Sequence, residues 1–251
     1  MHSKAIVARK PHIRSATAET ENGSLGARAR RGRPCQIAEP ERRQLLLDAA
    51  ESVFLELGFS AASMDDIAHR AGMSKKTLYR IFDTKKSLFA AVIAARRAVL
   101  DAMIESNTGA GNEAAEDVLG CYLNKVARFV LAPRQAALYR LVIAESLREP
   151  ELAHAFYHEG PCKVRAVLEG WLARQHRKGT LNVPDPERDA GMLCSMAISE
   201  LQMRLLVGGL RAPDEALIDA TVTRAVELFL QGARPRQENP RQEELSGQER
   251  G

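Results

Sequence analysis

The sequence predicts an all-α protein, and three observations support this. Alanine, leucine, arginine and glutamate, which favour helix, dominate the composition. Apolar residues recur three and four positions apart along most of the chain, the spacing of one helical face. Runs of β-branched residues with a period of two are absent, so no sheet is predicted. With 251 residues, 45% of them hydrophobic and 27% charged, the chain is long enough to bury a real core.

Residues 1–38 are predicted to form a disordered, basic N-terminal arm, because they contain few large apolar side chains. This arm holds eight Lys/Arg against two Asp/Glu. Near its end, Arg31-Gly-Arg33-Pro34 resembles an AT-hook, whose arginines enter the narrow minor groove of A·T-rich DNA. Arg31 and Arg33 are therefore candidate DNA contacts. A solvated basic tail is the alternative.

Two short helices joined by a glycine turn are predicted after a first helix from about Pro40 to Leu57. The second helix begins at Ser63, a good N-cap that is followed by two aspartates in the first turn. The turn falls at Gly72, and Ser74 caps a third helix from Lys75 to about Ile81. This is the pattern of a helix-turn-helix.

The outer face of the predicted third helix is polar and cationic, which suits the edges of bases and the phosphates of DNA. Lys85, at the start of the next helix, and the caps Ser63 and Ser74 are placed where phosphates are attracted. The candidate contacts are Ser63, Ser74, Lys75, Lys76, Thr77, Tyr79, Arg80 and Lys85, with Arg31 and Arg33 of the arm.

Thr84 is expected to cap a long fourth helix from Lys85 to about Ser106, which is followed by a loop at Asn107–Asn112. Further helices are predicted at Glu113–Leu131, Arg134–Arg148, Glu151–His158, Pro161–Lys178, Pro186–Val207 and Pro213–Gln231. The predicted organisation is the arm (1–38), an N-terminal helix-turn-helix DNA-binding domain (39–95), a larger helical ligand-binding and dimerisation domain (96–232) and a polar tail (233–251).

Residues 39–95 resemble the DNA-binding domain of TetR/AcrR-type bacterial transcriptional regulators. The resemblance rests on Ala49-Ala50, Phe54, Gly58-Phe59, Ser63-Met-Asp-Asp-Ile-Ala68, Ala71-Gly-Met-Ser74, Thr77-Leu-Tyr79, Phe82, Thr84-Lys85 and Leu88-Phe89. The second half resembles the regulatory domain of the AefR-type subgroup through Leu141-Val-Ile-Ala-Glu145, Pro150-Glu-Leu152, Phe156-Tyr157 and Gly160-Pro161. One departure is Lys86, where relatives often carry an acidic residue; it is interpreted as an additional phosphate contact.

The resemblance implies a repressor that binds a pseudo-palindromic, double-stranded DNA operator as a homodimer and is released by a small hydrophobic or aromatic effector. The interface is expected on Pro186–Val207 and Pro213–Gln231, through Leu193, Met196, Ala197, Leu201 and Leu205 on one helix and Leu217, Ile218, Val222, Val226, Phe229 and Leu230 on the other. The expected pocket lining is Tyr122, Phe129, Tyr139, Ile143, Phe156, Trp171, Met192 and Met196, with a polar contact from Glu145, Arg140 or His154.

No catalytic constellation, phosphate loop or metal-ligand cluster is visible, so an enzyme is not expected and no cofactor or metal is implied. The chain shows no export signal and no apolar stretch of membrane-spanning length, which predicts a cytoplasmic bacterial protein that is associated with the nucleoid when bound to DNA. Two alternatives are kept: an architectural A·T-rich DNA-binding protein without an effector, and a regulator that senses thiol oxidation at Cys121 or Cys194.

Overall fold

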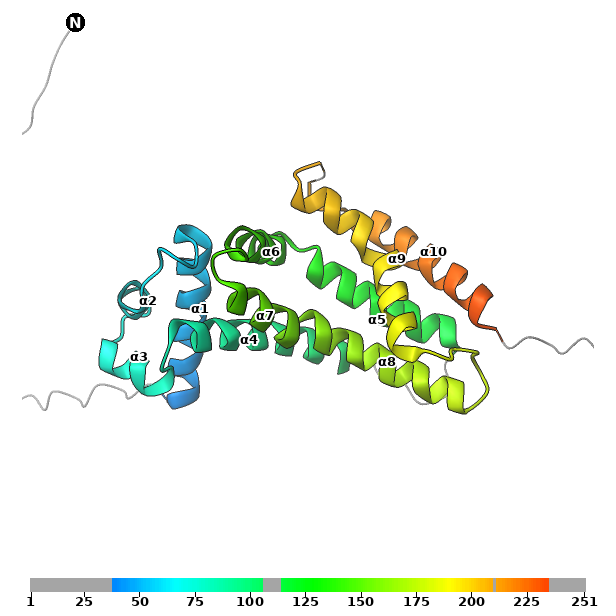
Figure 1. The fold of residues 1–251 in the computed structure, drawn as a ribbon, viewed down its shortest axis with the longest axis horizontal. Coiled ribbons are helices and arrows are strands. Elements are labelled where there is room, and N and C mark those ends of the chain that lie inside the picture. The colour runs from blue at the N-terminus through cyan, green and yellow to red at the C-terminus, as the bar shows by residue number, and fades with distance from the viewer. Residues whose placement is uncertain (1–37, 106–113, 210, 235–251) are drawn as a thin grey trace, which may run out of the picture. The chain divides into compact units, whose positions relative to one another are not determined.

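A computed structural model describes residues 38–105, 114–209 and 211–234 of the chain, and these residues form ten α-helices and no strand (Figure 1). The all-α prediction is confirmed. The helices are α1 (Glu39–Leu57), α2 (Met64–Arg70), α3 (Lys75–Ile81), α4 (Lys85–Glu105), α5 (Ala115–Val130), α6 (Pro133–Glu145), α7 (Pro150–Glu159), α8 (Pro161–Arg177), α9 (Pro186–Leu206) and α10 (Glu215–Ala233). The predicted minor-groove contacts Arg31 and Arg33, the loop 107–112 and nearly all of the tail lie outside the described residues.

Side-chain caps fix the helix starts that the sequence predicted. The Ser63 hydroxyl accepts a hydrogen bond from the Asp66 N–H at 3.1 Å, and the Asp66 carboxylate accepts one from the Ser63 N–H at 3.0 Å. This reciprocal arrangement satisfies amide groups that the first turn leaves without partners. Asp214 caps α10 by accepting from the Leu217 N–H at 2.8 Å, so that helix begins at Glu215, two residues later than predicted.

The helix-turn-helix unit is built around a first core that continues into the helices that follow it. Phe54, Phe59 and Phe89 pack against one another with ring centroids 5.4 to 5.7 Å apart. Figure 1 shows α2 and α3 beside α1 and the beginning of α4. The same core also contains Leu138 and Val142 of α6 and Leu152 and Phe156 of α7. A shift of α6 or α7 therefore acts directly on the packing of the helix-turn-helix.

A second core holds together α5, α8, α9 and α10 with the far end of α4. Leu100 of α4 is fully buried in it, beside Leu123 of α5. Since Leu88 and Phe89 belong to the first core, helix α4 runs continuously from one core to the other across the predicted domain boundary at residue 95.

Candidate functional site

Helix α3 presents its polar side chains outward because one apolar residue anchors it from within. Leu78 has no exposed surface, and Phe82, directly after the helix, is 4% exposed. Of the side chains predicted on the outer face, Lys75, Lys76, Tyr79 and Arg80 are exposed, whereas Thr77 is half-buried. The hydroxyl of Ser74 lies 2.9 Å from that of Thr77 and caps the helix. The structure thus brings these candidate contacts together on one face.

Two ion pairs surround this face. Lys75 pairs with Asp65 of α2, and both side chains are more than half exposed, so water screens the attraction and a phosphate can displace the carboxylate. Arg70 donates to both oxygens of Glu56 on α1, at 2.8 and 2.6 Å. This hydrogen bonding lowers the pKa of the Glu56 carboxyl and ties α2 to α1.

The side chain of Lys85 points in a different direction from the one that the sequence predicted. Its ammonium group donates to the carbonyl oxygens of Phe59, Ala62 and Ser60, at 2.6, 2.8 and 3.2 Å. These three bonds use all its N–H groups, so Lys85 closes the loop between α1 and α2 and does not reach toward a phosphate. Burial lowers its pKa, against the opposing effect of Glu149 and Glu145. The position at a helix start was predicted correctly, but the direction of the side chain was not.

Lys86 forms an exposed ion pair, as Lys75 does. It pairs with Glu151 and lies 3.8 Å from Glu149, at the start of α7. Close by, the Glu145 carboxylate at the end of α6 accepts hydrogen bonds from the Ser60 hydroxyl at 2.5 Å and the Ser60 N–H at 3.3 Å. Both contacts tie the helix-turn-helix to α6 and α7.

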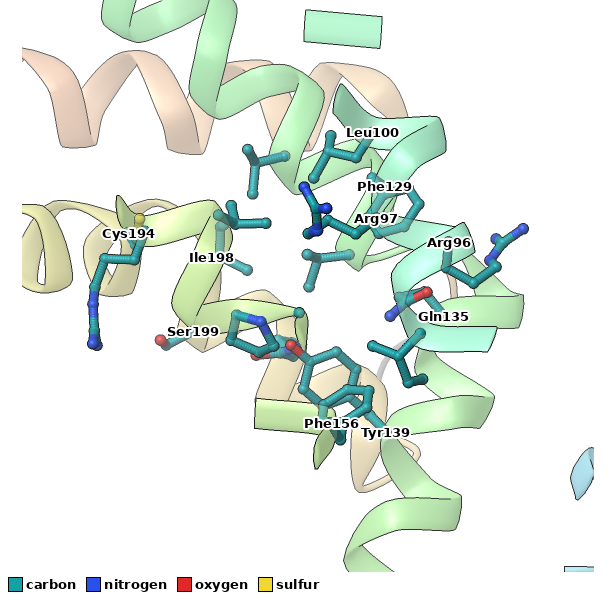
Figure 2. A pocket seen from close by; sticks show the side chains of 18 of the residues that line it. Arg96, Arg97, Leu100, Phe129, Gln135, Tyr139, Phe156, Cys194, Ile198 and Ser199 are labelled. Atoms are coloured by element: carbon teal, nitrogen blue, oxygen red, sulfur yellow. The ribbon is translucent and has the colours of Figure 1, made fainter. Parts of the chain in front are cut away.

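A cavity of about 200 Å³ lies among helices α4 to α9. Of the predicted lining residues, Phe129, Tyr139 and Phe156 border it, and Figure 2 shows Tyr139 against Phe156, their ring centroids 4.8 Å apart. Further apolar and small side chains complete the walls: Ile93, Leu100, Val126, Val130, Gly160, Pro161, Val164, Gly191, Cys194 and Ile198.

The other five predicted lining residues do not border this cavity. Tyr122 is buried in the second core, where its hydroxyl donates to the Val164 carbonyl at 2.6 Å, and Trp171 packs against the same core. Ile143, Met192 and Met196 are 58%, 56% and 41% exposed. Large apolar residues mark a helix face without showing what covers it. On α9, Met192 and Met196 are exposed beside the face that lines the cavity.

Polar side chains that the prediction missed also line the cavity. On α4, Arg96 and Arg97 stand between Ile93 and Leu100 at positions i, i+3, i+4 and i+7, which form one helical face. Arg165, Gln135, Gln202, Ser195 and Ser199 complete the polar lining. Two adjacent cations on an otherwise apolar face of α4 were the available sequence signal.

Three buried polar atoms of the lining residues have no hydrogen-bond partner within the described ranges. They are Nε of Arg96, Nε of Arg97 and Oε1 of Gln135, whereas the Gln202 amide interacts with the Tyr139 hydroxyl. Leaving such a group unsatisfied costs about 1–3 kcal/mol, so their concentration at one place requires an explanation. Figure 2 shows Arg97, Gln135 and Phe129 close together among the lining side chains, while the end of the Arg96 side chain points away from them.

The three polar candidates from the sequence have other roles. Glu145 binds Ser60, as described above, and His154 is exposed on α7, where its ring stacks on His158. Arg140 donates to the Leu205 and Leu206 carbonyls, at 2.5 and 3.1 Å, and so caps the end of α9.

A buried carboxylate connects the helix-turn-helix to the cavity wall. Glu51 of α1 is 3% exposed and accepts from Nε and Nη2 of Arg134 on α6, at 2.7 and 2.8 Å. Nε of Arg96, on the cavity, lies 3.7 Å from the same carboxylate. One negative charge therefore faces two guanidinium groups, and the more distant of the two borders the cavity.

The last two helices use their predicted interface residues in the core of the chain itself. Leu193, Ala197, Leu201 and Leu205 of α9, with Ile218, Val222 and Val226 of α10, are all buried within the second core. Of the predicted set, Met196 and Leu217 are exposed. The apolar side chains that these helices turn to solvent are Met192, Met196, Met203, Val207, Leu217 and Leu228.

The described residues form neither a membrane span nor a cluster of metal ligands. No helix there is long and apolar enough to cross a membrane. In the same ranges, His, Cys, Asp and Glu side chains do not gather into a group of three or more that suits a metal ion. The Cys194 thiol borders the cavity, and burial, opposed by Arg165, raises its pKa to about 11.

Comparison with known families places both halves of the chain. Residues 46–92 match the model described as bacterial regulatory proteins, tetR family, and residues 117–232 match the C-terminal domain of AefR-like transcriptional repressors. These matches coincide with the helix-turn-helix and with the helices that enclose most of the cavity.

Curated relatives are transcriptional regulators that match parts of the chain. The HTH-type transcriptional activator FasR of Mycolicibacterium smegmatis is 48% identical over 58 residues, 23% of this chain and 26% of that protein. The regulator SrpR of Pseudomonas putida is 31% identical over 114 residues, 45% of this chain and 51% of that one. With TtgW, also of Pseudomonas putida, 30% identity over 114 residues covers 45% of this chain and 81% of the relative. The match therefore spans about a quarter and about half of the first two relatives.

Solved structures share the fold over most of the chain. The Flavonoid-responsive Regulator FrrA superposes with a TM-score of 0.66 at 30% identity, covering 79% of this chain and 100% of that one. A TetR-family regulator from Mesorhizobium loti gives a TM-score of 0.69 at 24% identity, covering 80% and 100%.

Proposed function

The chain belongs to the TetR family of bacterial transcriptional regulators, and on that premise we propose that it is a homodimeric repressor that a small effector releases from its operator. The observation that carries this proposal is that the chain has both an exposed cationic face on α3 and a cavity. Arg96 in the wall of the cavity contacts Glu51 of α1, which belongs to the same helix-turn-helix unit as α3. The C-terminal match to AefR-like repressors favours repression over activation.

The operator contacts are proposed on the outer face of α3. Lys75, Lys76 and Thr77 lie where base edges in the major groove come within reach, and Tyr79 and Arg80 are placed for phosphates. Ser63 and Ser74 remain candidates for phosphate. Lys85 is left out because three backbone carbonyls bind its ammonium group, whereas Lys86, whose pair with Glu151 is as exposed as that of Lys75 with Asp65, stays available to a phosphate.

The dimer is proposed through the solvent-facing side of α9 and α10, since one helix-turn-helix reads too few base pairs to define an operator. The exposed residues Met192, Met196 and Met203 follow helical spacing along α9, and Leu217 and Leu228 do so along α10. Pairing this face with a second copy gives a four-helix bundle and sets two recognition helices about 34 Å apart.

The effector is proposed to bind in the cavity and to shift the population of the protein toward a conformer that does not bind the operator. It releases the operator only by binding the non-operator conformer more tightly. Helix α4 carries the change, because Leu88 and Phe89 pack in the first core while Arg96 and Arg97 line the cavity. The aromatic walls, and the name of the flavonoid-responsive relative, support an aromatic effector.

The test of operator binding is a footprint and a titration on the DNA upstream of the gene. We expect discrete protection over an inverted repeat, and loss of that protection when Lys75→Ala, Lys76→Ala and Tyr79→Phe are combined. Arg177→Ala with Lys178→Ala, exposed cations at the end of α8, is the matched control. Protection that is diffuse and strongly salt-dependent would instead support the architectural alternative.

The dimer is tested by replacing one exposed methionine. Met196→Asp is expected to convert the dimer to a monomer in sedimentation and to weaken operator binding, because a buried charge is costly at an apolar interface. Val167→Asp, at an equally exposed apolar site on α8, is the control and is expected to remain dimeric.

A thiol-oxidation switch is the second candidate, and Cys194 counts against it. The nucleophile in such chemistry is the thiolate, and a pKa raised to about 11 keeps this group protonated at neutral pH. Cys121 is exposed and remains the site on which that alternative rests. A cytoplasmic location and association with the nucleoid follow from the proposed role on DNA.

A further inference from the structure

We propose that the effector is a small single-ring aromatic anion, of the carboxylate class, held by Arg96 and Arg97 at the α4 wall of the cavity. This inference rests on the proposed effector site and adds the charge and size of its ligand. It is argued from the charge balance of the lining, the unpartnered polar atoms and the dimensions of the cavity.

The charge of the lining is positive. Three arginines, Arg96, Arg97 and Arg165, are among the residues that line the cavity, and no Asp or Glu of the described residues is. Arg97 is paired with Asp101 one turn further along α4. The nearest carboxylate to Arg96 is Glu51, and both oxygens of Glu51 already accept hydrogen bonds from Arg134. An anion in the cavity gains an attraction that its own neutral analogue does not.

The unpartnered atoms match the acceptors of a carboxylate. Nε of Arg96 and Nε of Arg97 are buried donors without a hydrogen-bond partner in the described part of the chain. A carboxylate offers acceptors to such donors, and bonds between ionised groups are stronger than neutral ones. Oε1 of Gln135, on a side chain that is 6% exposed, is an acceptor and suits a ring hydroxyl. A hydrocarbon would leave these three atoms unsatisfied.

The size and walls of the cavity indicate a single aromatic ring. At about 200 Å³ it is somewhat larger than the cavity of about 150 Å³ that accommodates benzene. Phe129, Tyr139 and Phe156 provide aromatic walls for edge or face contacts. The remaining volume accommodates a short side chain that ends in the charged group.

The position of Arg96 gives this anion a route to the helix-turn-helix. Because Glu51 and the ligand face the same guanidinium, a bound carboxylate competes with Glu51 of α1 for Arg96. The competition predicts that neutralising Glu51 strengthens anion binding, which is the opposite sign from neutralising Arg96.

The experiment measures binding of 3-phenylpropanoate and of its neutral isostere 3-phenylpropanamide to the full chain by calorimetry. We expect the carboxylate to bind at least about tenfold more tightly than the amide. Arg96→Met and Arg97→Met are each expected to remove about tenfold of the carboxylate affinity while leaving amide binding unchanged. Glu51→Gln is expected to raise carboxylate affinity several-fold.

Arg128→Met is the matched control, because Arg128 is similarly half-buried and ion-paired, to Asp219, but does not border the cavity. Arg97→Lys keeps the charge and is expected to restore part of the binding if Arg97→Met lowers stability. Equal binding of acid and amide, or binding of the acid unaffected by Arg96→Met and Arg97→Met, overturns the inference.

Failure of benzoate, phenylacetate and 3-phenylpropanoate to bind at millimolar concentration also overturns the inference. The proposed function fails separately, if no small molecule of any charge alters operator affinity. If a neutral aromatic molecule releases the operator, the proposed effector site is therefore supported and the proposal of an anionic effector is wrong.

Discussion

The recognition face and the cavity place charged groups in opposite surroundings. On α3, the cations Lys75, Lys76 and Arg80 are exposed to water. Beneath them, the apolar side chain of Leu78 is fully buried. At the cavity, Arg96 and Arg97 are side chains only 26% and 28% exposed, each with a buried Nε that lacks a partner among the described residues. The exposed cations on α3 therefore have little electrostatic cost in the protein without DNA. The partly buried arginines at the cavity do have such a cost.

This difference separates the energetics of the two sites. The recognition face is stable without DNA and gains affinity from new contacts with phosphates and bases. The cavity holds unsatisfied polar atoms, so a matching ligand both adds contacts and relieves an existing cost. Stability therefore depends most on the apolar anchor of α3, while ligand response depends on the buried arginines.

The largest predicted effect is at that anchor. Leu78→Ala removes a fully buried side chain and is expected to lower the free energy of unfolding by about 3 kcal/mol, because a cavity remains in the tightly packed first core. Urea unfolding followed by circular dichroism measures it. Val164→Ala, at the wall of a cavity that already exists, is the matched control, with an expected cost of about 1 kcal/mol.

If both substitutions cost the same, the contrast between a tightly packed unit and a loosely packed cavity would be wrong. Equal costs would mean that the side chains around the cavity are packed as tightly as those beneath α3.

The second effect is at the carboxylate that joins the two regions. Glu51→Gln leaves the guanidinium groups of Arg134 and Arg96 without their shared anion and is expected to destabilise the protein by about 2 kcal/mol, less than for a fully buried pair because both arginines are partly exposed. Thermal unfolding measures the loss. In Glu51→Gln combined with Arg134→Met, we expect a cost smaller than the sum of the single substitutions; additive costs would show that the pair contributes nothing.

The helix-turn-helix was predictable because its signals are local. Ser63 with Asp66, the glycine turn at Gly72 and the cap at Ser74 each act within a few residues, and the structure contains all three. The outward face of α3 followed from Leu78, the one position that must point inward. Helices α4 to α10 were also predicted within a few residues at most ends, since proline and glycine mark their limits.

The cavity was less predictable because its lining depends on how six helices rotate about their axes. Tyr122 and Trp171 satisfied every sequence criterion for a pocket and lie in the second core instead. Lys85 shows the same limit, since its carbonyl partners are more than twenty residues away in the sequence. Gln135 and Gln202 gave no sequence signal, because an amide on a helix is ordinary until its surroundings are known.

A smaller effect is expected on the recognition face of α3. There a substitution changes the affinity for the operator and leaves the stability of the fold unchanged. Lys76→Ala is expected to weaken operator binding by about 1 kcal/mol and to reduce the salt dependence by about one unit of slope, as the loss of one phosphate contact does. Fluorescence anisotropy at several salt concentrations measures both, and the unfolding midpoint is expected to stay within about 1 °C because Lys76 is exposed. Lys178→Ala is the control, and an unchanged slope in Lys76→Ala would remove Lys76 from the interface.

The smallest effect sharpens the link between the two regions through pH. Hydrogen bonding from Ser60 holds the pKa of the Glu145 carboxyl below its ordinary value of 4.5. A carboxyl with a lowered pKa stabilises the fold above that ordinary value, and the contribution disappears as the pH falls through the lowered one.

The stability difference between the wild type and Glu145→Gln is therefore expected to be about 0.5 kcal/mol and constant from pH 7 to pH 5, and to shrink below pH 4.5. Ser60→Ala is expected to remove most of this pH dependence, since the hydroxyl is its principal cause. Urea unfolding of the four variants of this cycle between pH 3 and pH 7 provides the measurement. A difference that persists at pH 3, or that is the same with and without the Ser60 hydroxyl, would mean that α6 is tied to the helix-turn-helix by apolar packing at Leu138 and Val142 and by the Glu51–Arg134 pair, without a contribution from Ser60 and Glu145.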